Sequence, residues 1–446
     1  MRLFFNGPIL TMDDEHHYYS DGVLVEDNGR IYAVGERSLL EKYPRVEKVD
    51  LKGKLLMPGL INAHIHLSQA LLRNQADDME LEPWLFDRVW PFQAAHTTES
   101  FLAGARLAML EMLKSGTTTF VESMVIHYGL DALAEEVEKI GMRAMLSKVV
   151  MREKKDILLP PQLRERFSEA LGEAVTCKKN RRKDSLVDIW LGPRWTGMYD
   201  AELLDLVREA MDEYDFTSTL HYAESAEDVQ KINTEAGCSP LQLLADKGLL
   251  DRKLLIIHGT CLPDSDLIYL KKSRASLVHC PVSAMKVGMG YANIPAMLAN
   301  GATVSLGTDA AACNNTHDVF REMRMVALLH KFQQKDSSLM NAETCLGMAT
   351  KGGAKSLYQS NRIGTLEVGK DADMITINLD AAHLQPFRNP YGALVYCANG
   401  SDVSDVYVRG HQLVCEGECL TLDKERVLFE AKKAQLEVAN RAGMVL

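Results

Sequence analysis

Two histidines near residue 65 have a spacing suited to metal binding. They follow a run of apolar residues of the kind found in buried β-strands. His64 and His66 close the run that begins at Leu55. Residues i and i+2 of a β-strand lie on one face, so both imidazoles point toward a common place. Paired imidazoles are frequent ligands of divalent metals. The pair alone is weak evidence, because a histidine at a strand end also forms hydrogen bonds with loop carbonyls.

Other polar residues stand at the ends of later apolar runs in the same way. His221 with Glu224, then His258, His279 and Asp309, each lie at or just after the C-terminal end of a short β-rich segment. Barrel enzymes with parallel strands keep their chemistry at this end of the strands. The combination therefore favours a single active site over a set of separate packing histidines.

Three histidines and one carboxylate around zinc leave one coordination position for water, whose pKa the metal can lower to roughly 7. We predict one divalent metal per chain, with Zn²⁺ expected and Fe²⁺ as the alternative. The predicted ligands are three imidazoles and one carboxylate: His64, His66, His221 and Asp309.

Glu224, His258 and Asp309 are the predicted catalytic residues. Glu224 follows His221 by three residues, where the chain turns and an acid can reach both the water and a substrate nitrogen. Its alternative is a solvated loop carboxylate. His258 lies on an apolar strand and is predicted to hydrogen-bond the water, the alternative being a core histidine. Asp309 is expected to bind metal and to accept the proton of the water.

From Gly59 to about Gly353, strand-like runs alternate with amphipathic segments, as in repeated βα units. Eight such units predict a closed (β/α)8 barrel of the TIM type, because an open doubly wound sheet would also need a Gly-rich phosphate turn. The predicted strands are Leu60–Leu67, Thr117–Glu122, Arg143–Val150, Val187–Gly192, Thr217–Ala223, Leu254–His258, Ser276–His279 and Thr303–Gly307.

Both ends of the chain have a different pattern, with short strands separated by turns. Neither end can bury a core alone, so we predict that they pair into one small β-sandwich domain. The expected boundaries are 1–57 and 361–422 for the two β-sandwich parts, 58–360 for the hydrolase barrel, and 423–446 for a C-terminal helix.

The composition of the chain argues against several classes of protein. The 446 residues carry a formal net charge of −11, and the basic cluster Lys178–Lys183 is local and reads as a solvated loop, so nucleic-acid binding is not expected. No signal-peptide or membrane-spanning run is found, which predicts a cytoplasmic protein without membrane association. Nine scattered cysteines without a Cys-x-x-Cys pair suggest neither a disulfide framework nor a thiolate zinc site.

Several segments together resemble the amidohydrolase superfamily, in its branch of zinc-dependent aminohydrolases and chlorohydrolases of nitrogen heterocycles. The resemblance covers nearly the whole chain and implies the metal and proton-transfer roles given above. Relatives with two metals use a modified lysine on the fourth barrel strand, which Val187–Gly192 lacks, so one metal is implied. It also implies a homo-oligomer. The segments are 58–66, 115–119, 221–224, 306–309 and 364–373.

Residues 281–286 and 314–324 resemble deaminases of methylthioadenosine and S-adenosylhomocysteine, but two positions differ. Gln93 stands where those enzymes place a ribose-binding glutamate, and Arg194, followed by Trp195, replaces a histidine. Gln93 and Trp84 are more like triazine hydrolases, and Arg194 is like guanine deaminases. A guanidinium suits a carbonyl or carboxylate, and a neutral amide suits the edge of a ring.

Trp84, Gln93, Arg194, His279 and Cys313 are accordingly the predicted substrate-binding residues. Trp84 stacks on a flat ring or packs at the rim, and Arg194 with Trp195 faces the pocket or packs in a loop away from it. The remaining histidines, among them His127, are expected to be surface or packing residues.

The predicted activity is hydrolytic deamination of an aromatic nitrogen heterocycle of aminopurine, pterin or aminotriazine type, with a metal hydroxide attacking the ring carbon and ammonia released. Alternatives within the same chemistry are methylthioadenosine/S-adenosylhomocysteine deamination and s-triazine dechlorination or alkylamine removal. A non-catalytic barrel used as a scaffold is the alternative from another class. That alternative predicts eroded ligands, and none is missing.

Overall fold

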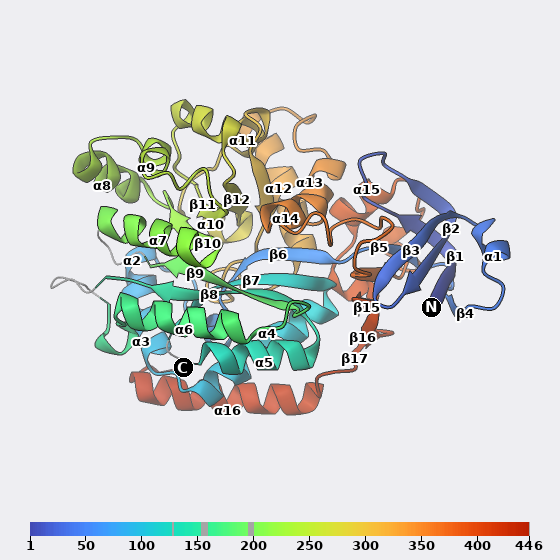
Figure 1. Cartoon of the computed structure of the whole chain (residues 1–446), viewed down its shortest axis with the longest axis horizontal. Coiled ribbons are helices and arrows are strands. Elements are labelled where there is room, and N and C mark those ends of the chain that lie inside the picture. Colours follow the sequence, from blue (N-terminus) through green and yellow to red (C-terminus); the bar gives the residue numbers. More distant parts are fainter. Residues whose placement is uncertain (127–128, 153–158, 195–199, 446) are drawn as a thin grey trace.

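Eight parallel strands form the centre of the molecule in the computed structural model, which describes residues 1–126, 129–152, 159–194 and 200–445. Each strand pairs in parallel with its neighbours in chain order, and helices surround the sheet (Figure 1). This confirms the predicted barrel. The strands are β6 Leu60–Ile65, β7 Thr117–Val125, β8 Arg143–Val150, β9 Val187–Pro193, β10 Ser218–Tyr222, β11 Leu254–His258, β12 Ser276–His279 and β13 Thr303–Leu306.

The first and last barrel strands meet at the predicted metal ligands. The backbone N–H of Asp309 donates to the carbonyl of His64 at 2.9 Å, and a parallel bridge joins Asp309 to Ile65. Gly307 makes this approach feasible, because a Cβ there would lie 2.7 Å from the Cβ of His64 and 2.9 Å from its backbone nitrogen. Closure of the barrel therefore brings the two ends of the candidate site together.

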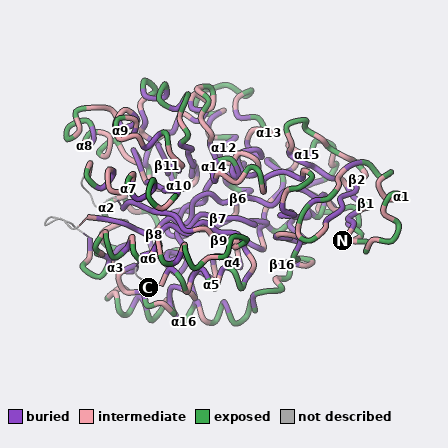
Figure 2. Tube along the Cα trace, viewed as in Figure 1, coloured by how far each residue is buried: buried purple, intermediate pink, exposed green. Residues whose placement is uncertain are grey.

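The barrel helices bury apolar residues at helical spacing. In α5, Leu133, Ala134, Val137 and Ile140 are buried, which is the i, i+1, i+4, i+7 pattern of a helix on a sheet. Figure 2 shows the buried residues concentrated along the central strands. The helices after the strands are α4 Thr98–Lys114, α5 Leu130–Ile140, α6 Phe167–Asn180, α7 Ala201–Tyr214, α8 Ala226–Ala236, α9 Pro240–Asp246, the 3-10 helix η4 Asp264–Lys272 after β11, α10 Pro281–Val287, α11 Ile294–Ala299, α12 Val319–Gln334, α13 Ala342–Met348 and α14 Lys351–Ser356.

A connected segment of short helices lies between β6 and α4 and covers the C-terminal ends of the barrel strands. It includes a π-helix, a rare form that is frequent at functional sites. Its elements are η1 Leu67–Leu72, α2 Leu81–Pro83, η2 Trp84–Val89 and α3 Trp90–Ala94.

Both chain ends contribute to one mixed nine-stranded sheet beside the barrel, as predicted (Figure 1). Strand β5 from the N-terminal part pairs antiparallel with β14 from the C-terminal part. The strands are β1 Arg2–Leu10, β2 Tyr18–Asp27, β3 Arg30–Glu36, β4 Glu47–Asp50, β5 Leu55–Pro58, β14 Met374–Ile377, β15 Val403–Val408, β16 His411–Cys415 and β17 Glu418–Cys419.

A buried ion pair ties this sheet region to the barrel. Arg143 at the start of β8 donates to Asp373 at 2.9 Å and to Asp371 at 2.8 Å, and all three side chains are buried. A planar guanidinium matches two carboxylates in this way and lysine does not. The contact fixes residues 371–373 immediately before β14.

Outside these two units, the helix α16 Lys424–Ala442 packs on α4, α3 and η1. The basic cluster expected in a loop is partly helical, because Lys178 and Lys179 belong to the last turn of α6, where cations interact favourably with the helix dipole. Among the described residues, no helix is both long and apolar enough to cross a bilayer.

Candidate metal centre and active site

Unusual backbone conformations occur at the strand ends that carry the predicted site. His258 and Asp309 have φ of 68° and 60°, and Ala223, between His221 and Glu224, has φ of 49°. This left-handed region is unfavourable for residues with a Cβ and is concentrated at functional sites. The turn at Ala223 explains how Glu224, three residues beyond His221, still reaches the same cavity.

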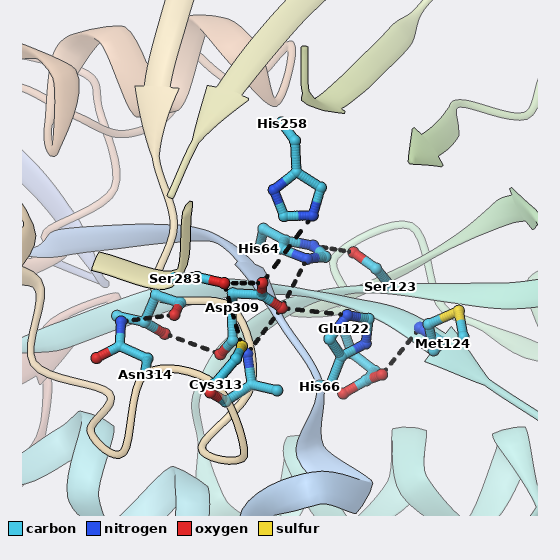
Figure 3. Close-up of polar contacts among 12 residues, drawn as sticks. His64, His66, Glu122, Ser123, Met124, His258, Ser283, Asp309, Cys313 and Asn314 are labelled. Carbon is cyan, nitrogen blue, oxygen red and sulfur yellow. Dashed lines mark hydrogen bonds and ion pairs between the residues drawn. The ribbon is translucent and has the colours of Figure 1, made fainter. Parts of the chain in front are cut away.

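Five side chains from four strand ends converge at the C-terminal mouth of the barrel. The ring centroid of His64 lies 4.7 Å from that of His66, 4.9 Å from that of His221 and 5.4 Å from that of His258. Asp309 Oδ1 lies 3.3 Å from Nε2 of His64 and 3.4 Å from Nε2 of His66. Figure 3 shows His64, Asp309 and His258 directed toward one another.

This donor set fits a divalent metal. Ligand atoms of His64, His66 and Asp309 all lie within 4.8 Å of one another, as do those of His64, His221 and His258. Nε2 of His64 is buried and has no hydrogen-bond partner among the described residues. A buried polar atom without a partner is costly unless a further group satisfies it. His258 thus belongs to the same group of ligand atoms as His221, the ligand proposed from the sequence.

The imidazoles are suited to act as neutral ligands. Burial lowers the pKa of His64 and His221 below the usual range and lowers the pKa of His66 to about 3. A neutral imidazole keeps the lone pair that a metal requires, whereas imidazolium does not. The protein environment thus prepares these rings for metal binding at neutral pH.

Two serines that the sequence did not single out orient the cluster. Ser123, at the end of β7, lies 2.8 Å from Nδ1 of His64 and leaves Nε2 directed at the centre. Ser283, in α10, donates to Asp309 Oδ2 at 2.6 Å. Groups of this kind fix the orientation of metal ligands and tune their basicity. Nothing in the local sequence distinguishes these serines from others, so only the fold reveals them.

Loss of the Ser283 hydroxyl is expected to weaken turnover moderately. In Ser283→Ala, Asp309 loses a hydrogen bond that holds its carboxylate, and kcat should fall about tenfold, because a hydrogen bond to a charged group contributes roughly 1.5–3 kcal/mol. Metal content should remain near that of the wild type. Steady-state kinetics with metal analysis provides the check, and Ser283→Thr, which keeps the hydroxyl, should recover most activity. Unchanged kcat in Ser283→Ala would show that Asp309 does not depend on this contact.

Glu224 and His258, the predicted proton-transfer residues, lie side by side next to the cluster. Oε1 of Glu224 lies 3.6 Å from Nε2 of His258, which is 4.0 Å from Asp309 Oδ2. Burial raises the pKa of Glu224 to about 7, although the nearby His258 opposes the shift. A carboxyl group with this pKa exchanges protons readily near neutral pH. The geometry thus places a carboxyl group with a raised pKa beside the candidate metal ligands.

A cavity of about 640 Å³ opens above these residues. One wall is the segment from Glu80 to Gln93, and the opposite wall includes the start of α8. Trp84 is fixed there, since its indole N–H donates to the carbonyl of Ala312 at 3.4 Å. The described lining is His66, Gln69, Glu80, Leu81, Glu82, Pro83, Trp84, Leu85, Phe86, Val89, Trp90, Gln93, Met124, Arg194, His221, Glu224, Ser225, Glu227, Asp228, Lys231, His258, Met289 and Asp309.

Gln93 and Arg194 face this cavity together and are both buried. The Arg194 guanidinium donates to Oε1 of Gln93 at 3.5 Å and lies 5.9 Å from the ring centroid of Trp90. Gln93 in turn donates to the hydroxyl of Ser68 at 3.3 Å. The amide oxygen of Gln93 is therefore engaged by the protein.

Two predicted substrate-binding residues lie outside the described lining. Cys313 is buried behind Asp309, 3.2 Å from the Ser283 hydroxyl, and burial raises the pKa of its thiol well above the usual range. His279 is buried with its ring centroid 5.6 Å from that of His330. In this arrangement both pack around the site. Trp195 and His127 are outside the described residues.

Comparisons with known proteins agree with this architecture. The model of the amidohydrolase family matches residues 55–413. A Bacillus cereus 5-methylthioadenosine/S-adenosylhomocysteine deaminase is 36% identical over 96% of this chain and 98% of its own length. A zinc-bound adenosine deaminase structure from Xanthomonas campestris is 30% identical, with a TM-score of 0.91 and 98% coverage of both chains. A zinc complex of atrazine chlorohydrolase from Arthrobacter aurescens shares the fold, with 23% identity, a TM-score of 0.90, and coverage of 98% and 100%.

Proposed function

Because the chain belongs to the amidohydrolase family, we propose that this hydrolase of non-peptide C–N bonds deaminates an aromatic nitrogen heterocycle by hydrolysis. The observation that carries the proposal is the position of Glu224. Its carboxyl group lies beside His258 and lines the same cavity as His66, His221 and Asp309. An acid–base group beside a metal-ligand cluster is the arrangement that hydrolytic removal of an amino group requires.

The proposed metal ligands are His64, His66, His221 and Asp309, with Zn²⁺ as the expected ion and Fe²⁺ as the alternative. When bound, such a metal acts as a Lewis acid that lowers the pKa of water to roughly 7. Zinc in the structure of the adenosine deaminase relative supports this assignment.

The chain's own residues would then handle the protons. Asp309 accepts a proton from the attacking water, and His258 holds that water in place by a hydrogen bond. Glu224 in its protonated form donates its proton to the ring nitrogen next to the attacked carbon. It then takes the remaining hydroxyl proton of the adduct as the ring carbonyl forms and passes that proton to the departing amine. The proton held by Asp309 returns to Glu224 and restores its protonated form. Ammonia leaves as the neutral amine, and the ring retains the oxygen.

Substrate selection is proposed to involve Trp84, Gln93 and Arg194. Arg194 supplies fixed donors for a ring carbonyl, and Trp84 provides a flat apolar surface. Gln93 is neutral and its oxygen already accepts from Arg194, so it offers ribose hydroxyls a weaker acceptor than a carboxylate at this position would. We therefore propose a flat ring of base size as the preferred substrate.

Deamination of a nucleoside thioether is the second candidate. Two observations favour it: the relative named as a methylthioadenosine/S-adenosylhomocysteine deaminase covers nearly the whole chain, and the cavity of about 640 Å³ exceeds what a bare ring fills. The two candidates share the metal ligands and Glu224 and differ only in the part of the cavity beyond the ring.

A panel of substrates distinguishes the two candidates. Catalytic efficiency for ammonia release is expected to be higher with guanine, a pterin or an aminotriazine than with methylthioadenosine or S-adenosylhomocysteine. A neutral amide in place of a carboxylate at position 93 should cost the binding of ribose hydroxyls about 1–3 kcal/mol, or roughly 5- to 150-fold in kcat/KM. A clear preference for either nucleoside would contradict the proposed specificity for a base-sized ring, but it would leave the proposal of a deaminase intact. Absence of ammonia release from every compound would count against deamination itself.

Three sequence-based expectations stand as proposals beside this function. They are the domain boundaries at residues 57/58, 360/361 and 422/423, a cytoplasmic location without nucleic-acid binding, and a homo-oligomeric state.

A further inference from the structure

Helix α12 has apolar residues on both of its faces. Its inner face is buried against the barrel and includes Met323, Val326 and Ala327. The opposite face carries a second apolar row, at the i, i+3, i+4, i+7 spacing that places side chains on one side of a helix. We call this row the α12 stripe: Met325, Leu328, Leu329 and Phe332.

The α12 stripe faces solvent. Phe332 is 81% exposed and Leu328 is 48% exposed, whereas Met325 and Leu329 are half-buried. Helices on a protein surface normally present polar residues to water, and an apolar patch indicates an interface. The elements α10 and η6 (Ala393–Cys397) contact α12, and each carries one exposed apolar side chain, Met285 and Tyr396 respectively.

The order of residues along the stripe is symmetric about its centre. Leu328 and Leu329 form the middle, with Met325 and Phe332 at equal separations on either side. Arg321 lies four residues before Met325, and Asp336 lies four residues after Phe332. The spacing of the apolar residues is therefore the same from either end of the stripe. The two flanking residues, Arg321 and Asp336, carry opposite charges.

Both terminal charges are exposed and held in place. The guanidinium of Arg321 donates to the Thr316 hydroxyl at 3.2 Å. Asp336 lies against the last turn of α12, since its backbone N–H donates to the carbonyl of Lys331 at 3.1 Å, and its carboxylate accepts from the Ser338 hydroxyl at 2.6 Å.

We propose that a second copy of this chain covers the α12 stripe, with the two α12 helices antiparallel about a twofold axis. Such an interface joins the same surface of each subunit, so residue i contacts j and j contacts i. Antiparallel pairing brings Phe332 against Met325 of the other copy and Leu328 against its Leu329. Arg321 then meets Asp336 at both ends, and the helix dipoles oppose each other.

An unrelated apolar partner explains this pattern less well. Such a partner would need an apolar surface but would give no reason for opposite charges at equal distances from the centre. In a symmetric dimer each copy contributes both charges, so two pairs of Arg321 with Asp336 form. Phe332, as a protruding aromatic residue, is the expected source of most of the binding energy, because exposed aromatic anchors dominate interfaces.

Sedimentation velocity of the full-length, metal-loaded protein at micromolar concentration tests the proposal. The wild type should be a dimer or an assembly of dimers. Phe332→Glu and Leu328→Glu should each raise the dissociation constant by about 30-fold or more. The matched control is Phe429→Glu on α16, where Phe429 is 70% exposed but has no such stripe. This variant should leave the mass unchanged, and all variants should keep the wild-type circular dichroism spectrum.

A charge exchange tests the antiparallel register. Arg321→Asp should weaken association, and the double variant Arg321→Asp/Asp336→Arg should restore it. A monomeric wild type, or an oligomer whose mass resists both stripe variants, would overturn the proposal. If the stripe variants dissociate the protein but Arg321→Asp/Asp336→Arg does not restore the association that Arg321→Asp weakens, the antiparallel pairing is wrong.

Discussion

Exhaustive chelation is expected to abolish ammonia release, and addition of about one equivalent of Zn²⁺ per chain should restore it. The four proposed ligands, which include three neutral imidazoles, would hold the ion, and the attack of water near neutral pH would depend on it. The His66→Ala variant should lose most of its metal, because His66 supplies one of these ligands. Elemental analysis of the purified protein, paired with the ammonia assay, gives the measurement.

Loss of metal must be separated from loss of fold in this experiment. His411→Ala is the matched control, since His411 is an exposed histidine on β16 of the small sheet and should keep both metal and turnover. Full occupancy by two metals per chain would contradict the single-metal scheme. Activity that survives exhaustive chelation would contradict the assignment of the cluster as a catalytic metal centre.

The barrel was predictable because its strands are apolar runs that end in polar, chemically active residues. The observed bounds of β8, β11 and β12 equal the predicted ones, and β9 extends one residue further, to Pro193. Buried parallel strands have this sequence pattern, since both of their faces are covered. The small sheet was predictable in outline from short strands at both chain ends, but its pairing of β5 with β14 depends on contacts far apart in the sequence.

The contacts around the candidate site were less accessible from the sequence. Ser123 and Ser283 act through tertiary contacts to His64 and Asp309, which no local spacing reports. Cys313 follows Asp309 by four residues, yet the loop turns its thiol toward Ser283 behind the carboxylate. The residue type at a strand end thus predicts which side chains meet at the site. The direction of a loop side chain, by contrast, depends on the conformation of the loop backbone.

Substitution of Glu224 by glutamine is expected to lower kcat by roughly 100-fold or more, since general acid–base catalysis typically contributes that much. Glutamine has nearly the same size and keeps a hydrogen-bonding group, but it cannot exchange a proton with the ring nitrogen or the departing amine. Fold and metal content should therefore stay close to those of the wild type. Steady-state kinetics, elemental analysis and thermal unfolding together provide the measurement.

Glu227→Gln is the matched control for this substitution. Glu227 lines the same cavity three residues further along the chain, but it is exposed and forms no hydrogen bond or ion pair with His258 or Asp309 among the described residues. Removing its charge alters the potential in the cavity by one unit without touching the proposed proton path, so kcat should change by no more than about twofold. If both variants lose activity equally, the cavity needs negative charge and not a proton carrier at Glu224. If Glu224→Gln retains near-normal turnover, Glu224 is a cavity carboxylate without a role in proton transfer, and the acid–base group must be sought among the other side chains at the strand ends.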